Sequence, residues 1–193
     1  MFRNLIVPDR WWSLVLVAFG GKLLLLVLVL LEHHIPLNGD WYFSGGDTTG
    51  YTEPIDSLLN GSGYQPDSRM PGYGVPYLLL RLIMSMHAAM QGLVLLQVLA
   101  SAFGVVLLAK LAYKLTDDPR VFRWTYWLAL LAIFSSFYDR FILTESFSAA
   151  ALVFVVYAII TLPHSKGYPR ILTAGAAMAW LISMTKLSCS RLS

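Results

Sequence analysis

The feature that most constrains the fold is an apolar run over residues 11–31, in which Lys22 is the one charged residue. A helix of about 20 apolar residues is long enough to cross the hydrocarbon core of a bilayer. The run is followed by Glu32-His33-His34-Ile35-Pro36, which lacks the small residues of a signal-peptidase site. The sequence therefore predicts an uncleaved first membrane span over residues 11–31.

Further apolar runs follow the first, at residues 72–86, 90–115, 121–137, 147–162 and 171–184. Because 57% of the 193 residues are hydrophobic and 13% are charged, the chain is too apolar for a water-soluble domain. One cysteine, Cys189, excludes an internal disulfide. Without repeats, low-complexity tracts or linkers, residues 1–193 are expected to form a single membrane domain.

The distribution of charge predicts the topology, because Lys and Arg near span ends remain cytoplasmic. Residues 32–72 hold six acidic residues and one basic residue, Arg69, so this loop is expected outside, with a cytoplasmic N-terminus. If residues 72–86 also crossed the membrane, the basic residues after the next span would lie outside: Lys110, Lys114, Arg120 and Arg123. We therefore expect residues 72–86 to form an interfacial helix on the outer surface.

The predicted fold is all-α and integral to the membrane, with about five transmembrane helices, one interfacial helix and a long external first loop. The spans are expected at about 11–31, 90–113, 121–138, 146–162 and 170–186, with the external loop at 32–71. The loop would be periplasmic or extracytoplasmic, at a plasma membrane or on the lumenal side of the endoplasmic reticulum. Basic residues scattered at span ends form no patch, which argues against nucleic acid as a partner.

This topology gathers polar residues on the outer side of the membrane: Asp47, Asp67, Arg69, Asp139, Arg140, Glu145 and Lys186. Charges collected at one membrane interface indicate a charged ligand there. Each residue also has a purely structural interpretation: Asp47 as a turn residue, Arg69 as a partner of Asp67, and Glu145 as an acid at a helix N-terminus. Lys22 would reach the interface or pair with an acid of another helix, and the sequence selects no partner.

Several motifs in this order resemble the GT-C superfamily of polyprenyl-phosphate-sugar-dependent membrane glycosyltransferases, in particular its protein mannosyltransferase and aminoarabinose transferase branch. The matching segments are Asp47 with Tyr51, Gly61-Ser62-Gly63-Tyr64, Arg69-Met70-Pro71-Gly72-Tyr73, Leu143-Thr144-Glu145, and Ala174-Gly175 through Met184-Thr185-Lys186. Members of this family are much longer. The resemblance therefore implies that residues 1–193 correspond to the N-terminal portion of the family's architecture, as a fragment or a truncated frame.

The resemblance implies transfer of a sugar from a polyprenyl-phosphate donor to an acceptor hydroxyl of a protein, lipid or glycan, with inversion. Asp47 is the candidate general base, because a carboxylate can accept the proton of the attacking hydroxyl. Arg69 is the candidate that stabilises the departing phosphate. Glu145 would orient the acceptor or, with Asp47, hold a divalent cation, the candidate cofactor. Tyr51, Tyr64 and Lys186 are further candidate substrate-binding residues.

A second interpretation from a different class is a non-catalytic five-helix membrane subunit, or a remnant, whose acidic external loop binds a partner. A transporter fits the sequence less well, because the charges other than Lys22 gather at one face and do not run through the spans.

Overall fold

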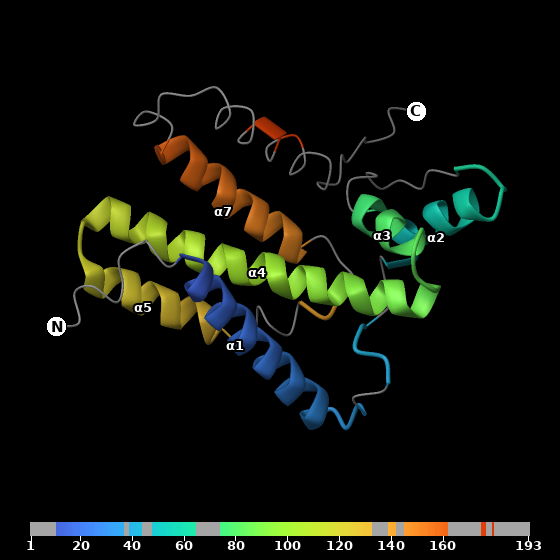
Figure 1. Ribbon diagram of the computed structural model, residues 1–193, viewed down its shortest axis with the longest axis horizontal. Coiled ribbons are helices and arrows are strands. Elements are labelled where there is room, and N and C mark those ends of the chain that lie inside the picture. The colour runs from blue at the N-terminus through green and yellow to red at the C-terminus, as the bar shows by residue number, and fades with distance from the viewer. Residues whose placement is uncertain are drawn as a thin grey trace, which may run out of the picture.

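The computed structural model describes residues 11–36, 39–43, 48–64, 74–132, 139–141 and 145–161, together with residues 175, 176 and 179. Within these residues the protein is all-helical, with six helices and no strand (Figure 1). The helices are α1 (Trp11–Glu32), α2 (Thr48–Leu59), α3 (Gly74–Arg81), α4 (Met86–Thr116), α5 (Pro119–Leu130) and α7 (Glu145–Thr161). The predicted all-α fold is confirmed for this part of the chain.

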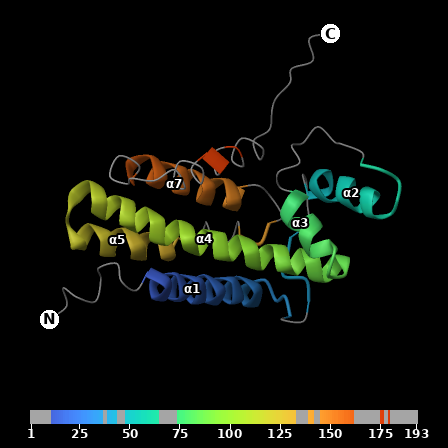
Figure 2. The ribbon, with the colours of Figure 1, turned by 45° about the horizontal axis from the view of Figure 1, so that its top comes forward.

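The longest helix, α4, forms the centre of the bundle, and α1, α5 and α7 pack along it while α3 packs near its start. Figures 1 and 2 show that successive helices of the bundle, in the order α1, α4, α5 and α7, alternate in direction. α1 and α7 lie on opposite sides of α4. The short helices α2 and α3 lie at the end of the bundle where α4 begins. Toward this end lie residues 39–43, which precede the candidate Asp47, and residues 139–141, which precede the candidate Glu145.

Two of the described helices, α1 and α4, are long and apolar enough to cross a membrane. α1 coincides with the predicted span at 11–31 and ends where His34 adopts a left-handed conformation, with φ of 55°, two residues before Pro36. α5 and α7 contain 12 and 17 residues, fewer than the roughly 20 that a straight span needs. The predicted fifth span at 170–186 lies outside the described residues except at three positions.

The helix in the segment predicted to be interfacial is shorter than the predicted range of 72–86, because α3 ends at Arg81 and α4 already begins at Met86. Ser85 separates them as the N-cap of α4, and its hydroxyl oxygen accepts a hydrogen bond from the Ala88 N–H at 3.4 Å. A serine at this position satisfies an amide that the first turn of a helix leaves without a partner. The second span, predicted at 90–113, is consequently longer at both ends.

The third span, predicted at 121–138, also differs, because α5 stops at Leu130. Its start is set by Asp118, whose Oδ1 accepts a hydrogen bond from the Arg120 N–H at 2.7 Å, and by Pro119 in the first turn. Proline suits this position because its missing N–H would have no helical partner there. Residues 133–138 lie outside the described part of the chain, so the predicted range is tested only to residue 132.

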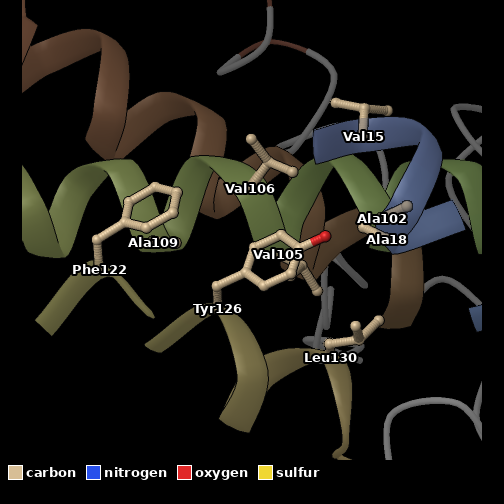
Figure 3. Packing of buried hydrophobic residues seen from close by; sticks show 9 residues of the cluster. All are labelled: Val15, Ala18, Ala102, Val105, Val106, Ala109, Phe122, Tyr126 and Leu130. Carbon is tan, nitrogen blue, oxygen red and sulfur yellow. The ribbon is translucent and has the colours of Figure 1, made fainter. Parts of the chain in front are cut away.

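The core between α1, α4 and α5 pairs small residues with large ones, as Figure 3 shows. Phe122, Tyr126 and Leu130 of α5 point toward the bundle, where α1 and α4 present valines and the alanines Ala18, Ala102 and Ala109. The Tyr126 hydroxyl donates a hydrogen bond to the Leu14 carbonyl oxygen at 2.9 Å. Small residues allow helices to approach closely in a membrane, where packing is a main source of stability.

Candidate functional site

Two segments far apart in the sequence meet within the bundle, toward the end that carries α2 and α3. Residues 39–43 precede Asp47, and residues 139–141 precede Glu145; we call these two segments together the loop junction. The Phe43 N–H donates a hydrogen bond to the Arg140 carbonyl oxygen at 2.9 Å. Phe43 and Phe141 form a parallel β-bridge, with ring centroids 4.7 Å apart. The backbone thus connects the two loops that contain the predicted acids.

Side chains from α4 hold the loop junction against the bundle. Gln97 donates from Nε2 to the Phe141 carbonyl oxygen at 2.9 Å, and Gln91 donates from Nε2 to the Gly39 carbonyl oxygen at 3.0 Å. His87 Nδ1 lies 3.0 Å from Oδ1 of Asp40. Both halves of the junction are therefore fixed to the same helix.

One residue of the loop junction, Asp139, forms a buried ion pair with α1. Lys22 and Asp139 are 1% and 2% exposed, and Lys22 Nζ lies 3.9 Å from Asp139 Oδ2. The Ser146 hydroxyl donates to Asp139 Oδ1 at 2.8 Å. Asp139 therefore contacts side chains from α1 and α7. The sequence had left the partner of Lys22 open, and Asp139 is an acid that fills this role.

The sequence predicted Asp139 and Arg140 on the outer side of the membrane, which stays a prediction; the structure shows that both side chains are buried. Arg140 is 5% exposed, and no described residue accepts a hydrogen bond from its Nε. Lys22 lies ten residues before the end of α1, which is about 15 Å along a helix. Because Asp139 reaches this depth, residues 139–141 lie inside the bundle, where Lys22, Gln97 and Phe43 satisfy part of their polar surface.

The first-loop helix α2 is attached to α3 through Asp56. Arg81 donates from Nε to Asp56 Oδ1 at 2.9 Å, and the Tyr77 hydroxyl donates to Oδ2 at 3.0 Å. Burial and the neighbouring Asp56 carboxylate raise the pKa of Tyr77, and the hydrogen bond to Asp56 raises the pKa of Arg81. Tyr77 therefore stays protonated as a donor, and Arg81 stays charged. α2 runs from Thr48 to Leu59 and is followed by Gly61, which has a φ of 79°.

An apolar groove of about 720 Å³ opens between α3, α4 and the start of α7. Its lining contains no charged side chain: Val75, Pro76, Leu79, Leu80, Ile83, Leu96, Leu99, Ala100, Phe103 and Phe147. Phe147 lies two residues after Glu145, so the groove ends close to the N-terminus of α7. A groove with this lining favours a hydrocarbon ligand.

The structure locates three of the predicted site residues. Glu145 is the first residue of α7, and the structure describes its backbone alone. Tyr51 is half-buried and packs against the cluster that contains Ile55 and Tyr77, and Tyr64 is exposed. Asp47, Arg69 and Lys186 lie outside the described residues.

The candidate divalent cation cannot be assigned to ligands within the described residues, where no group of three or more His, Cys, Asp or Glu side chains converges. The two carboxylates predicted to hold it, those of Asp47 and Glu145, are not among the side chains described. A cation at this site therefore stays a prediction.

Sequence reasoning did not identify the roles of Asp56 and Asp139. A signal for Asp139 existed, because a charge within a span requires a partner inside the bundle, but several acids met that condition. Asp56 resembled any other acid of an amphipathic helix. Compared with known proteins, the chain matches no family model, no curated protein and no solved structure.

Proposed function

We propose that this protein is a membrane glycosyltransferase, or the N-terminal part of one, that moves a sugar from a polyprenyl-phosphate donor to an acceptor hydroxyl. The observation that carries the proposal is the hydrogen bond from the Phe43 N–H to the Arg140 carbonyl oxygen. It joins the loop that leads to Asp47 and the loop that leads to Glu145. Base-assisted attack requires a carboxylate within hydrogen-bond reach of the attacking hydroxyl, and this contact brings together the two loops that lead to the candidate carboxylates.

The apolar groove supports a donor with a long hydrocarbon chain. Its lining comes from the interfacial helix α3, from α4 and from Phe147 of α7. A polyprenyl chain in this groove would leave its phosphate near the N-terminus of α7, and helix N-termini favour anions. In this arrangement the lipid lies in the groove and the sugar lies at the loop junction.

The proposed mechanism assigns a role to each candidate residue. Asp47 accepts the proton of the acceptor hydroxyl as the new glycosidic bond forms at the anomeric carbon with inversion. The bond between this carbon and the phosphate oxygen breaks, and Arg69 stabilises the charge on the departing polyprenyl phosphate. Glu145 orients the acceptor or holds a cation with Asp47. Tyr51, Tyr64 and Lys186 bind substrate.

The proposal includes a five-span topology with the N-terminus in the cytoplasm. Four helices that alternate in direction agree with this layout over residues 11–161, and α1 and α4 have the length and composition of spans. α5 and α7 are shorter than a bilayer is thick. They would cross it together with neighbouring segments, and non-helical backbone is tolerated at membrane depth where protein covers it.

The experiment is a transfer assay with the full-length protein in proteoliposomes. The probes are synthetic polyprenyl-phosphate mannose and polyprenyl-phosphate aminoarabinose, and the assay measures released polyprenyl phosphate. We expect release by the wild type and a loss of about a hundredfold or more in Asp47→Asn. Glu53→Gln, which changes an exposed acid of the same loop, is the matched control and should retain activity.

Two results would contradict the proposal. Asp47→Asn with wild-type activity would remove the general base. A wild type that releases no polyprenyl phosphate from either donor, and binds neither of them, would favour the alternative of a non-catalytic subunit whose acidic loop binds a partner.

A further inference from the structure

The buried pair of Lys22 and Asp139 is not used by the proposed chemistry. Neither residue is among the candidates that touch donor or acceptor, yet both side chains are almost completely buried. A charge within a membrane bundle is costly, and replacing a buried ion pair with apolar side chains is often neutral or stabilising. Stability alone therefore does not account for a lysine in the middle of the leucine-rich α1.

The contacts of Asp139 extend to both loops that carry the candidate acids. On one side, Asp139 accepts a hydrogen bond from Ser146, which directly follows Glu145 in the first turn of α7. On the other side, the next residue, Arg140, accepts the backbone hydrogen bond from Phe43, four residues before Asp47. The carboxylate that contacts Lys22 thus makes the first of these connections itself and lies one residue from the second.

We propose that Lys22 and Asp139 are positioning residues, whose ion pair fixes the loop that precedes Glu145 and the loop that precedes Asp47 relative to each other. Lys22 sits on α1, which packs along α4 and so gives the pair a rigid base. Ser146 fixes the start of α7 from the same carboxylate. This inference rests on the proposed function for its catalytic consequence, whereas its structural consequence, the contact between the two loops, is independent of any activity.

The closing experiment measures that contact directly. In a Cys189→Ser background, the double replacement Phe43→Cys and Phe141→Cys places two thiols at a bridge pair whose ring centroids lie 4.7 Å apart. Adjacent bridge partners lie within the Cα distance that a disulfide spans. The rate of disulfide formation, followed by mass spectrometry of the linked peptides, reports how often the loops meet.

The test variant combines Lys22→Met with Asp139→Asn, so that no buried charge is left without a partner. Asparagine can still accept the hydrogen bond from Ser146, so the variant removes mainly the attraction to Lys22. We expect it to fold, with an unfolding temperature near that of the wild type, but to form the disulfide about tenfold more slowly. Lys22→Met alone is the second variant and should show the same slowing if it folds. Leu24→Met, on the lipid-facing side of α1, is the control and should match the wild type.

The transfer assay then separates positioning from general stability. Before oxidation, the variant that combines Lys22→Met with Asp139→Asn (the neutral-pair variant) should lose about a hundredfold in turnover, with little change in KM for the donor. This is the loss expected when catalytic groups are displaced by about 1 Å. After the disulfide has formed, turnover should recover most of that loss, because the covalent bond replaces the ion pair in holding the loops.

Disulfide formation at the wild-type rate in the neutral-pair variant would overturn the inference. A turnover loss that the disulfide does not restore would also overturn it. A wild type without transferase activity would contradict the proposed function instead. The rates of disulfide formation alone would then test whether Lys22 and Asp139 position the two loops.

Discussion

Arg81 of α3 donates a hydrogen bond from Nε to Oδ1 of Asp56 in α2, at 2.9 Å. The contact joins the helix α2 to the helix α3, and Tyr77 donates to the other oxygen of the same carboxylate. α2 also packs on α3 through the apolar cluster around Ile55 and Tyr77. One carboxylate and this cluster therefore both join the two helices.

Replacing Asp56 with alanine should release α2 from α3. Hydrogen bonds to charged groups contribute about 1.5–3 kcal/mol, so the free energy of local opening of α2 should fall by a few kcal/mol. Amide hydrogen exchange in detergent or nanodiscs measures this as faster exchange across residues 48–59, with α4 unchanged. Glu53→Ala removes an exposed acid from the same helix and should exchange as the wild type does. Equal exchange in both variants would show that the apolar cluster alone holds α2.

Tyr77 should be among the last tyrosines to ionise as the pH rises. Burial and Asp56 raise its pKa, so the folded protein favours the neutral phenol. Its contribution to stability is present below the ordinary pKa of about 10 and is lost as the pH rises through the raised value. In an absorbance titration of tyrosinate formation, the absorbance change below about pH 11 should be the same in Tyr77→Phe as in the wild type. A smaller amplitude in that range would mean that Tyr77 ionises normally.

The two neighbouring glycines of α1 should differ in their tolerance of a larger side chain. A Cβ at Gly21 would lie 3.1 Å from Leu130 Cδ1, whereas a Cβ at Gly20 would meet nothing within 4 Å. Gly21→Val should therefore push α1 away from the end of α5 and cost about 1–3 kcal/mol by overpacking. Gly20→Val is the matched control, with the same change in helix propensity. Thermal unfolding in one detergent compares them, and equal melting temperatures would contradict the packing of Leu130 on α1.

Filling the apolar groove should weaken binding of the donor's lipid chain. Ala100→Trp adds an indole to the groove lining between α3 and α4, and the expected result is at least about tenfold weaker labelling by a photoactivatable polyprenyl phosphate. Leu108→Trp places the same side chain on an exposed position of α4 outside the groove and should label normally. If Ala100→Trp labels as strongly as the wild type, the lipid binds elsewhere.

The sequence predicted most accurately the helices whose boundaries follow a change in hydropathy. The apolar run at 11–31 became α1 almost without change, and the run at 146–162 became α7, since hydropathy and helix length suffice there. The single predicted helix at 72–86 was wrong at its end, although Ser85 carried a capping signal within an apolar run. Hydropathy averages over such a residue, while the backbone responds to its hydroxyl.

Long-range contacts could not be predicted in the same way. Lys22 required a partner inside the bundle, yet choosing Asp139 needs the packing of α1 and α7 on α4, which no pattern along the chain specifies. The meeting of Phe43 with Arg140 is of the same kind, because it is a backbone contact without a side-chain signature. The roles assigned to Asp47, Arg69, Glu145 and Lys186 stay predictions for the experiments above.

The length of α4 has a consequence for the membrane around the protein. Its 31 residues extend about 46 Å, whereas the hydrocarbon core of a bilayer is about 30 Å thick. A helix that exceeds the bilayer tilts, protrudes or thickens the lipid around it. Since α1, α3, α5 and α7 all pack on α4, any tilt of α4 moves the whole bundle, and the loop junction moves with it. If α4 spans a bilayer, the acyl length of the lipid therefore influences the depth of the loop junction.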